Sequence, residues 1–103
     1  MQANLFVAAA LVTLFGAAPG AHAADAAAGK AKAAACAGCH GPNGEGSGPN
    51  PAIAAMPQAK FVQALKDYKS GKRPNAVMKS SVASLDDADM ANLAAYYASL
   101  KKK

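Results

Sequence analysis

The residues best suited to chemistry are two cysteines and a histidine within five consecutive positions, Cys36-Ala-Gly-Cys39-His40. These are the only cysteines in the chain. Two thiols spaced three residues apart lie on the same side of a helical turn, and an imidazole follows the second thiol directly. This spacing is compatible with a redox-active dithiol, with part of a zinc site, or with covalent attachment of a haem.

Haem attachment is the chemistry that the rest of the sequence favours. A thioredoxin-like dithiol lies at a strand-to-helix junction, but no segment alternates apolar and polar residues as a strand does. Zinc needs about four ligands, and residues 24–103 contain no Cys or His beyond Cys36, Cys39 and His40. In a haem site each thiol adds to one vinyl group of the porphyrin, and Nε2 of the adjacent histidine binds the iron.

The first 23 residues have the anatomy of a secretory signal peptide. An apolar run at residues 5–18 is followed by the small-residue site Ala21-His22-Ala23, after which we expect cleavage. An uncleaved membrane anchor is the alternative, but a span needs about 18 or more apolar residues, and Thr, Gly and Pro residues interrupt this stretch. The sequence therefore predicts a signal peptide at residues 1–23 and one exported domain at residues 24–103.

The size of that domain also favours a bound group. A chain of this length builds a side-chain core of marginal stability. A disulfide between Cys36 and Cys39 would close too short a loop to remove much entropy from the unfolded state. A haem is a large, flat, apolar group around which short helices can pack, so it would stabilise the fold as well as supply the chemistry.

The charge of the chain indicates what kind of partner it meets. Eleven Lys or Arg residues against six Asp or Glu residues give a formal net charge of +5. A basic surface favours an acidic protein, an anionic membrane or a nucleic acid. Export and the lack of interleaved basic and aromatic residues argue against nucleic acid. We therefore expect protein partners with acidic docking patches, although the same lysines would also serve solubility alone.

Helices are the expected secondary structure of the exported domain, and three to four of them fit its length. The first, residues 26–37, follows Asp25 as an N-cap and is rich in alanine, the strongest helix former. The second, residues 58–70, ends before Gly71. Residues 41–57, rich in Gly, Pro and Asn, predict a loop between them. A loop this long is unusual unless it wraps something.

The last helix is expected to begin after Ser84. Ser84 and Asp87 stand at the spacing of an N-cap residue and its N3 partner in a capping box. The apolar stripe of this helix can close on the small residues of the first helix. A basic, polar loop at residues 72–83, which contains Met78, is expected before it.

With these features in place, the exported domain resembles a small class I cytochrome c of the bacterial periplasmic monohaem type. The resemblance implies an all-α fold in which the first and last helices cross, with Gly29 opposite the Leu93 and Tyr96 region. It also implies one covalent haem c and a periplasmic location. The matching segments are Gly29, CAGCH at 36–40, GPNPAI at 48–53, a methionine before the last helix, and Leu93-Ala-Ala-Tyr96.

The second axial ligand of the iron is expected to be a methionine. Met56, Met78 and Met90 are the candidates in the exported domain. Met90 belongs to the apolar stripe of the last helix, where methionine usually fills a core. The resemblance places the ligand at Met78, and a thioether opposite His40 is the ligation that raises the reduction potential for electron transfer.

Further contacts to the haem follow from the same resemblance. The carbonyl of Pro51 is expected to accept a hydrogen bond from Nδ1 of His40, because a metal-bound imidazole needs such a partner. Several apolar or aromatic side chains are candidates for the walls of the pocket, and each of them is also a candidate for ordinary core. They are Ile53, Phe61, Val62, Leu65, Tyr68 and Leu93.

These residues predict an electron carrier and not an enzyme. If the protein fills both axial positions, the iron has no open site for a substrate, and no spare histidine is available as a general acid or base. The iron would alternate between Fe(II) and Fe(III), and Lys72, Arg73 and Lys79 would meet redox partners near the haem edge. The alternatives are a haem c subunit dedicated to one oxidoreductase, a gas-binding or peroxidatic haem protein with a labile sixth ligand, and an exported helical protein without haem.

Overall fold

The computed structural model describes residues 24–100, and within this range the chain forms five helices and no strand. The predicted signal peptide at residues 1–23 lies outside the described residues. None of the described helices is long and apolar enough to cross a membrane. The all-helical prediction is confirmed, with more helices than the three to four expected. The helices are α1 (Ala26–Lys32), α2 (Ala34–His40), α3 (Gln58–Ser70), α4 (Ala76–Val82) and α5 (Asp87–Ser99).

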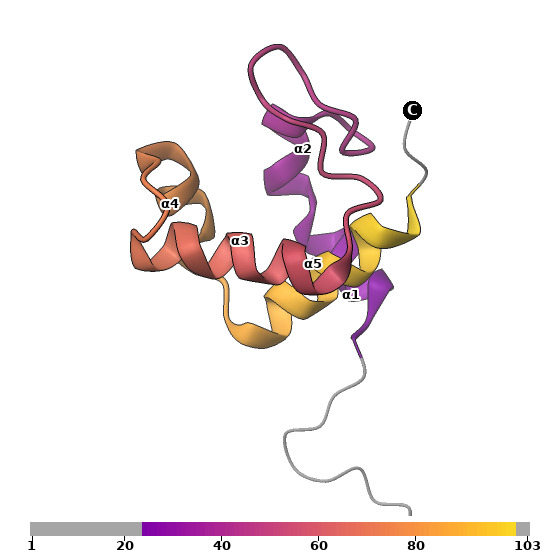
Figure 1. Ribbon diagram of the computed structural model, residues 1–103. Helices are drawn as coiled ribbons and strands as arrows, with labels where there is room; N and C mark the ends of the chain where they lie inside the picture. Colours follow the sequence, from indigo (N-terminus) through magenta and orange to yellow (C-terminus); the bar gives the residue numbers. More distant parts are fainter. Residues whose placement is uncertain (1–23, 101–103) are drawn as a thin grey trace, which may run out of the picture.

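Helices α1 and α5 cross in close contact, as Figure 1 shows at the base of the fold. The crossing requires a glycine, because a Cβ atom at Gly29 would overlap the backbone oxygen of Asn92 and lie 2.9 Å from Cβ of Tyr96. The side chain of Asn92 also accepts a hydrogen bond of 2.8 Å from the backbone N–H of Asp25. The predicted crossing of the first and last helices is therefore confirmed.

The helix predicted at residues 26–37 is divided in two at Ala33. This residue is buried, and its N–H is shared between the carbonyls of Gly29 and Lys30. The chain turns there, so α2 leaves the direction of α1 and continues to His40 (Figure 1). Alanines on both sides of the turn hide it from sequence patterns, because alanine favours helix equally before and after the bend.

Helix α3 has the predicted bounds and supplies the middle of the core. Gly71 ends it in the left-handed conformation, at φ +84°. Phe61 and Leu65 are buried on the side of α5, and the ring of Phe61 stacks on that of Tyr97 with centroids 5.6 Å apart. Tyr97, Met90 and Leu93 of α5 are the largest fully buried side chains in the described range.

Two predictions between α3 and α5 are wrong. Residues 72–83 are not only a loop, because they contain α4. The capping box of α5 consists of Asp86 and Asp89 and not of Ser84 and Asp87, so the helix starts about two residues later. Each of the two carboxylates accepts the backbone N–H of the other residue. The hydrogen bond from the N–H of Asp89 also lowers the pKa of the Asp86 carboxyl.

Substituting Gly29→Ala tests the helix crossing. The added methyl group has no space beside Asn92, and overpacking of this kind costs typically about 1–3 kcal/mol of folding free energy. Denaturant unfolding of the holoprotein should show a loss of this size.

Gly38→Ala is the matched control for that variant, because Gly38 is also helical and a Cβ there would meet nothing within 4 Å. It should leave stability unchanged or raise it by up to about 1 kcal/mol. Equal stability of the Gly29→Ala variant and the unsubstituted protein would contradict the close crossing.

Candidate haem-binding site

A cavity of about 460 Å³ separates α2 from α3 and α4. Its volume is in the range of about 300–1,000 Å³ typical of ligand and cofactor sites. The walls are mostly apolar, and residues 49–53 of the long loop close one end. The residues that line it include the predicted attachment sites and iron ligands, the predicted partner of His40 and several predicted wall residues: Cys36, Cys39, His40, Met78, Pro51, Ile53, Phe61 and Leu65.

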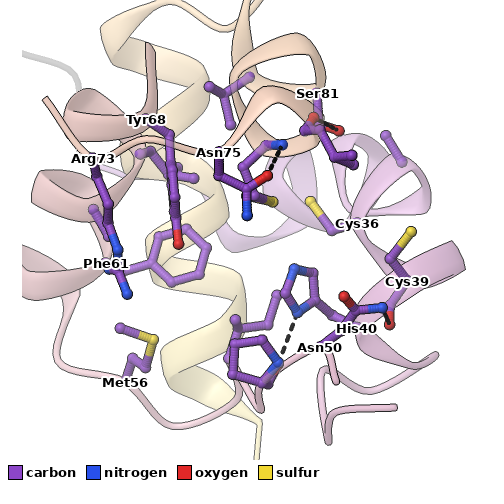
Figure 2. Close-up of a pocket in the computed structure, with 18 of the residues that line it drawn as sticks. Cys36, Cys39, His40, Asn50, Met56, Phe61, Tyr68, Arg73, Asn75 and Ser81 are labelled. Carbon is purple, nitrogen blue, oxygen red and sulfur yellow. Dashed lines mark hydrogen bonds between the residues drawn. The ribbon is translucent and has the colours of Figure 1, made fainter. Parts of the chain in front are cut away.

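The imidazole of His40 is held in one orientation at the end of α2. It is 7% exposed, and its Nδ1 lies 2.8 Å from the carbonyl oxygen of Pro51 (Figure 2). A carbonyl oxygen only accepts, so Nδ1 carries the proton and donates it. The proton on Nδ1 leaves the lone pair of Nε2 free for a metal ion. This contact is the one that the family resemblance implied.

The loop is tied to α2 by two further hydrogen bonds. The N–H of Gly46 donates to the carbonyl of His40 at 2.7 Å, and Nδ2 of Asn50 donates to the carbonyl of Cys39 at 3.0 Å. Both carbonyls belong to the last turn of the helix, where no partner within the helix is available. The loop therefore satisfies the end of α2 and at the same time holds Pro51 beside His40.

The two thiols lie on the same side of the cavity, next to His40 (Figure 2). They are free and not joined in a disulfide. Burial raises the pKa of the Cys36 thiol, although a hydrogen bond with the Tyr97 side chain partly offsets this effect. Burial also raises the pKa of the Tyr97 phenol, so both groups stay protonated at neutral pH.

The same residues do not form a zinc-type cluster. No group of three or more His, Cys, Asp or Glu side chains that could hold a metal ion is found within residues 24–100.

The three candidate methionines lie in different surroundings. Met78 lines the cavity from α4, which lies apart from α2 (Figure 1). Met90 is 1% exposed within the helical core and does not line the cavity, as expected for a core residue. Met56 also lines the cavity, from the end of the long loop. Met78 and Met56 thus both place a thioether in the cavity wall.

Four of the predicted wall residues line the cavity and two do not. Ile53, Phe61, Leu65 and Tyr68 line it, whereas Val62 and Leu93 are absent from its walls. Leu93 is fully buried in α5, and Val62 is next to Phe61 on α3 but packs against the core cluster. Core residues and cavity-wall residues are both apolar, so apolar character alone did not distinguish Val62 and Leu93 from the four residues that line the cavity.

Polar wall residues were largely missed from the sequence. Asn50, Lys60, Asn75 and Ser81 line the cavity together with Arg73, the only one of them predicted to lie near the haem edge. Lys60 had a usable signal, because it precedes Ala64 and Tyr68 by four and eight residues and so shares their face of α3. The guanidinium of Arg73 lies 4.9 Å from the centroid of the Tyr68 ring, a cation–π distance.

The arrangement fits a haem. Two thiols lie at one edge of the cavity, a histidine with an available Nε2 stands beside them, and a methionine occupies a different wall. The remaining walls are mostly apolar, and Lys60 and Arg73 bring positive charge that suits the carboxylates of a porphyrin. Thiols would attach a haem covalently, and an imidazole and a thioether are side-chain groups that can ligate its iron.

Comparison with known proteins agrees with this fit. The Cytochrome c family model matches residues 26–101. Cytochrome c4 of Pseudomonas aeruginosa is 43% identical over 83 residues, which cover 79% of this chain and 41% of that protein. Cytochrome c-554(548) of Halomonas halodenitrificans is 37% identical over 81 residues, covering 75% of this chain and 98% of that protein.

A solved structure shares the fold. The crystal structure of reduced recombinant cytochrome c4 from Pseudomonas stutzeri superimposes with a TM-score of 0.73 at 32% identity, covering 79% of this chain and 48% of that one. The chain thus spans about half the length of the cytochrome c4 proteins that it matches. With the family matched over most of its length and the fold shared, the chain belongs to the cytochrome c family and has the class I cytochrome c fold.

Proposed function

We propose that this protein is an electron carrier with one haem c bound through thioether bonds at Cys36 and Cys39. The observation that carries the proposal is the set of groups around one cavity: both thiols, the oriented imidazole of His40 and the thioether of Met78. The chain has two cysteines, which is the number that one covalent haem uses. When bound, the haem iron supplies a one-electron couple between Fe(II) and Fe(III).

In this proposal His40 and Met78 would hold the haem iron. His40 presents Nε2 because Pro51 holds the proton on Nδ1. Met78 approaches from α4, which lies on a different wall from α2. Together the two side chains would close both axial positions to external ligands, so the residues bind and orient the cofactor without opening a site for a substrate. Thioether ligation and mostly apolar walls both favour the reduced state and raise the potential.

The surface near the cavity suits brief encounters with acidic redox proteins. Arg73 and Lys60 line the cavity, and Lys72 and Lys79 are exposed on the same segment as Met78. Val77 also lines the cavity and is 68% exposed, the one large apolar side chain so exposed in the described range. The positive charges would steer an acidic partner toward the cavity, and the apolar side chain of Val77 would then contact that partner.

The proposal includes the location of the protein. Residues 1–23 would be removed as a signal peptide, which would leave the haem domain at residues 24–103 in the periplasm. An exported chain leaves the cytosol, where glutathione and thioredoxin keep thiols reduced, and enters the oxidising periplasm.

Replacing Met78→Ala tests the carrier function against a gas-binding or peroxidatic one. The unsubstituted protein, expressed with the haem attachment machinery, should have a polypeptide mass raised by one haem and a weak ferric band at the red end of the visible spectrum. The variant should keep the haem mass, lose this band, lower its potential and bind carbon monoxide when reduced, because its sixth position is open.

Three results would contradict the proposal in different ways. A mass without a haem would exclude the cofactor. Unchanged spectrum and potential in Met78→Ala would exclude Met78 as the ligand, and Met56→Ala would then be the variant to examine. Carbon monoxide binding by the unsubstituted protein would favour the gas-binding alternative.

Reversing the charge of Arg73 tests the docking surface. Arg73→Glu should slow electron exchange with an acidic redox protein about 10-fold or more at low ionic strength, since steering raises association rates by 10–10³. The difference should shrink as salt is added. Lys30→Glu is the matched control, because it changes the net charge equally on α1, whose residues do not line the cavity. Equal slowing in both variants would contradict a localised surface.

A further inference from the structure

The side chain of Asn75 holds the first turn of α4 at the position of Met78. Asn75 is the N-cap residue of this helix, with extended backbone at φ −166° and ψ 108°. Its Oδ1 accepts a hydrogen bond of 3.0 Å from the backbone N–H of Met78. Its own carbonyl accepts one of 2.9 Å from the N–H of Lys79. The cap is therefore made to the methionine itself and not merely to a neighbour.

Helix α4 packs on α3, and Met78 itself packs against the core cluster. Helix α4 has seven residues, which is too short to be stable without tertiary contacts. Val82, at its far end, is its only buried residue. The chain before it, residues 71–74, is exposed throughout. Asn75 thus makes the side-chain hydrogen bond that holds the backbone of Met78 at the exposed start of the helix.

Asn75 also belongs to the cavity wall. It lines the cavity together with Met78, Val77 and Ser81. Figure 2 shows its carboxamide beside the cavity, with the oxygen engaged in the dashed hydrogen bond. One side chain therefore caps α4 and also forms part of the cavity wall. It fixes the position of the first turn of α4 relative to the cavity.

We propose that Asn75 is a positioning residue that keeps Met78 in the cavity wall, where the thioether would bind the haem iron in place of an external ligand. This inference rests on the proposed function, in which Met78 is that ligand. Removing the cap would leave the N–H of Met78 without its side-chain partner and would favour states in which the start of α4 moves away from the cavity. An external ligand binds only those states, so its apparent affinity follows their population.

The test is the binding of imidazole to the ferric holoprotein, followed by the change in its visible spectrum. In Asn75→Ala imidazole should bind about fivefold more tightly, the factor that corresponds to losing a typical N-cap hydrogen bond. Asn75→Asp and Asn75→Ser both keep an N-cap acceptor. They should bind imidazole as the unsubstituted protein does.

Asp86→Ala is the control for a general loss of stability. It removes an N-cap of the same kind from α5, whose described residues contribute nothing to the cavity wall. Denaturant unfolding should show a comparable loss of stability in Asp86→Ala and Asn75→Ala. Only the second should alter imidazole affinity.

Met78→Ala separates this inference from the proposed ligation. If it greatly tightens imidazole binding while Asn75→Ala has no effect, the role of Asn75 is wrong and the ligation stands. If Met78→Ala itself leaves imidazole binding unaltered, ligation and inference fail together. Equal tightening in Asp86→Ala and Asn75→Ala, or failure of the Asp and Ser variants to restore the affinity, would also overturn the positioning role.

Discussion

The hydrogen bond between Nδ1 of His40 and the carbonyl of Pro51 is the interaction on which the site depends. It joins the end of α2 to the loop that follows, fixes which nitrogen carries the proton, and buries the ring at the cavity wall. Asn50 and Gly46 support it by bonding to the last carbonyls of the same helix. A loop rich in Gly, Pro and Asn can follow such a path because Gly46 adopts φ +92°, and a Cβ there would lie 3.0 Å from the N of Ala52.

The rest of the fold consists of two regions. One is a core built where α1, α3 and α5 meet, closed at Gly29 and filled by Tyr97, Met90 and Leu93. The other is the cavity, which lies between α2 on one side and α3 and α4 on the other. Tyr97 joins the two, because it is buried in the core and its ring stacks on Phe61 of the cavity wall. A group placed in the cavity would thus complete a core that the side chains begin.

The sequence predicted the parts of this arrangement that local spacing determines. The thiols and histidine of residues 36–40 and the bounds of α3 follow from short patterns, whereas the crossing at Gly29 was implied by the family resemblance. The bend at Ala33 and the helix around Met78 were not predicted, because tertiary packing decides them. An alanine-rich run carries no signal for a bend, and α4 is held by the cap at Asn75, by its contacts with α3 and by Val82, its one buried residue. The sequence did not predict polar wall residues such as Asn50 and Asn75. Their hydrogen-bond partners are backbone atoms, which every residue has, so no sequence pattern marks these contacts.

X-ray absorption at the iron edge of the ferric holoprotein is the most direct test of the central claim, that His40 and Met78 hold one haem iron between them. The account predicts a sulfur atom bonded directly to iron together with nitrogen donors from the porphyrin and the imidazole. A spectrum that requires only nitrogen or oxygen donors would contradict it.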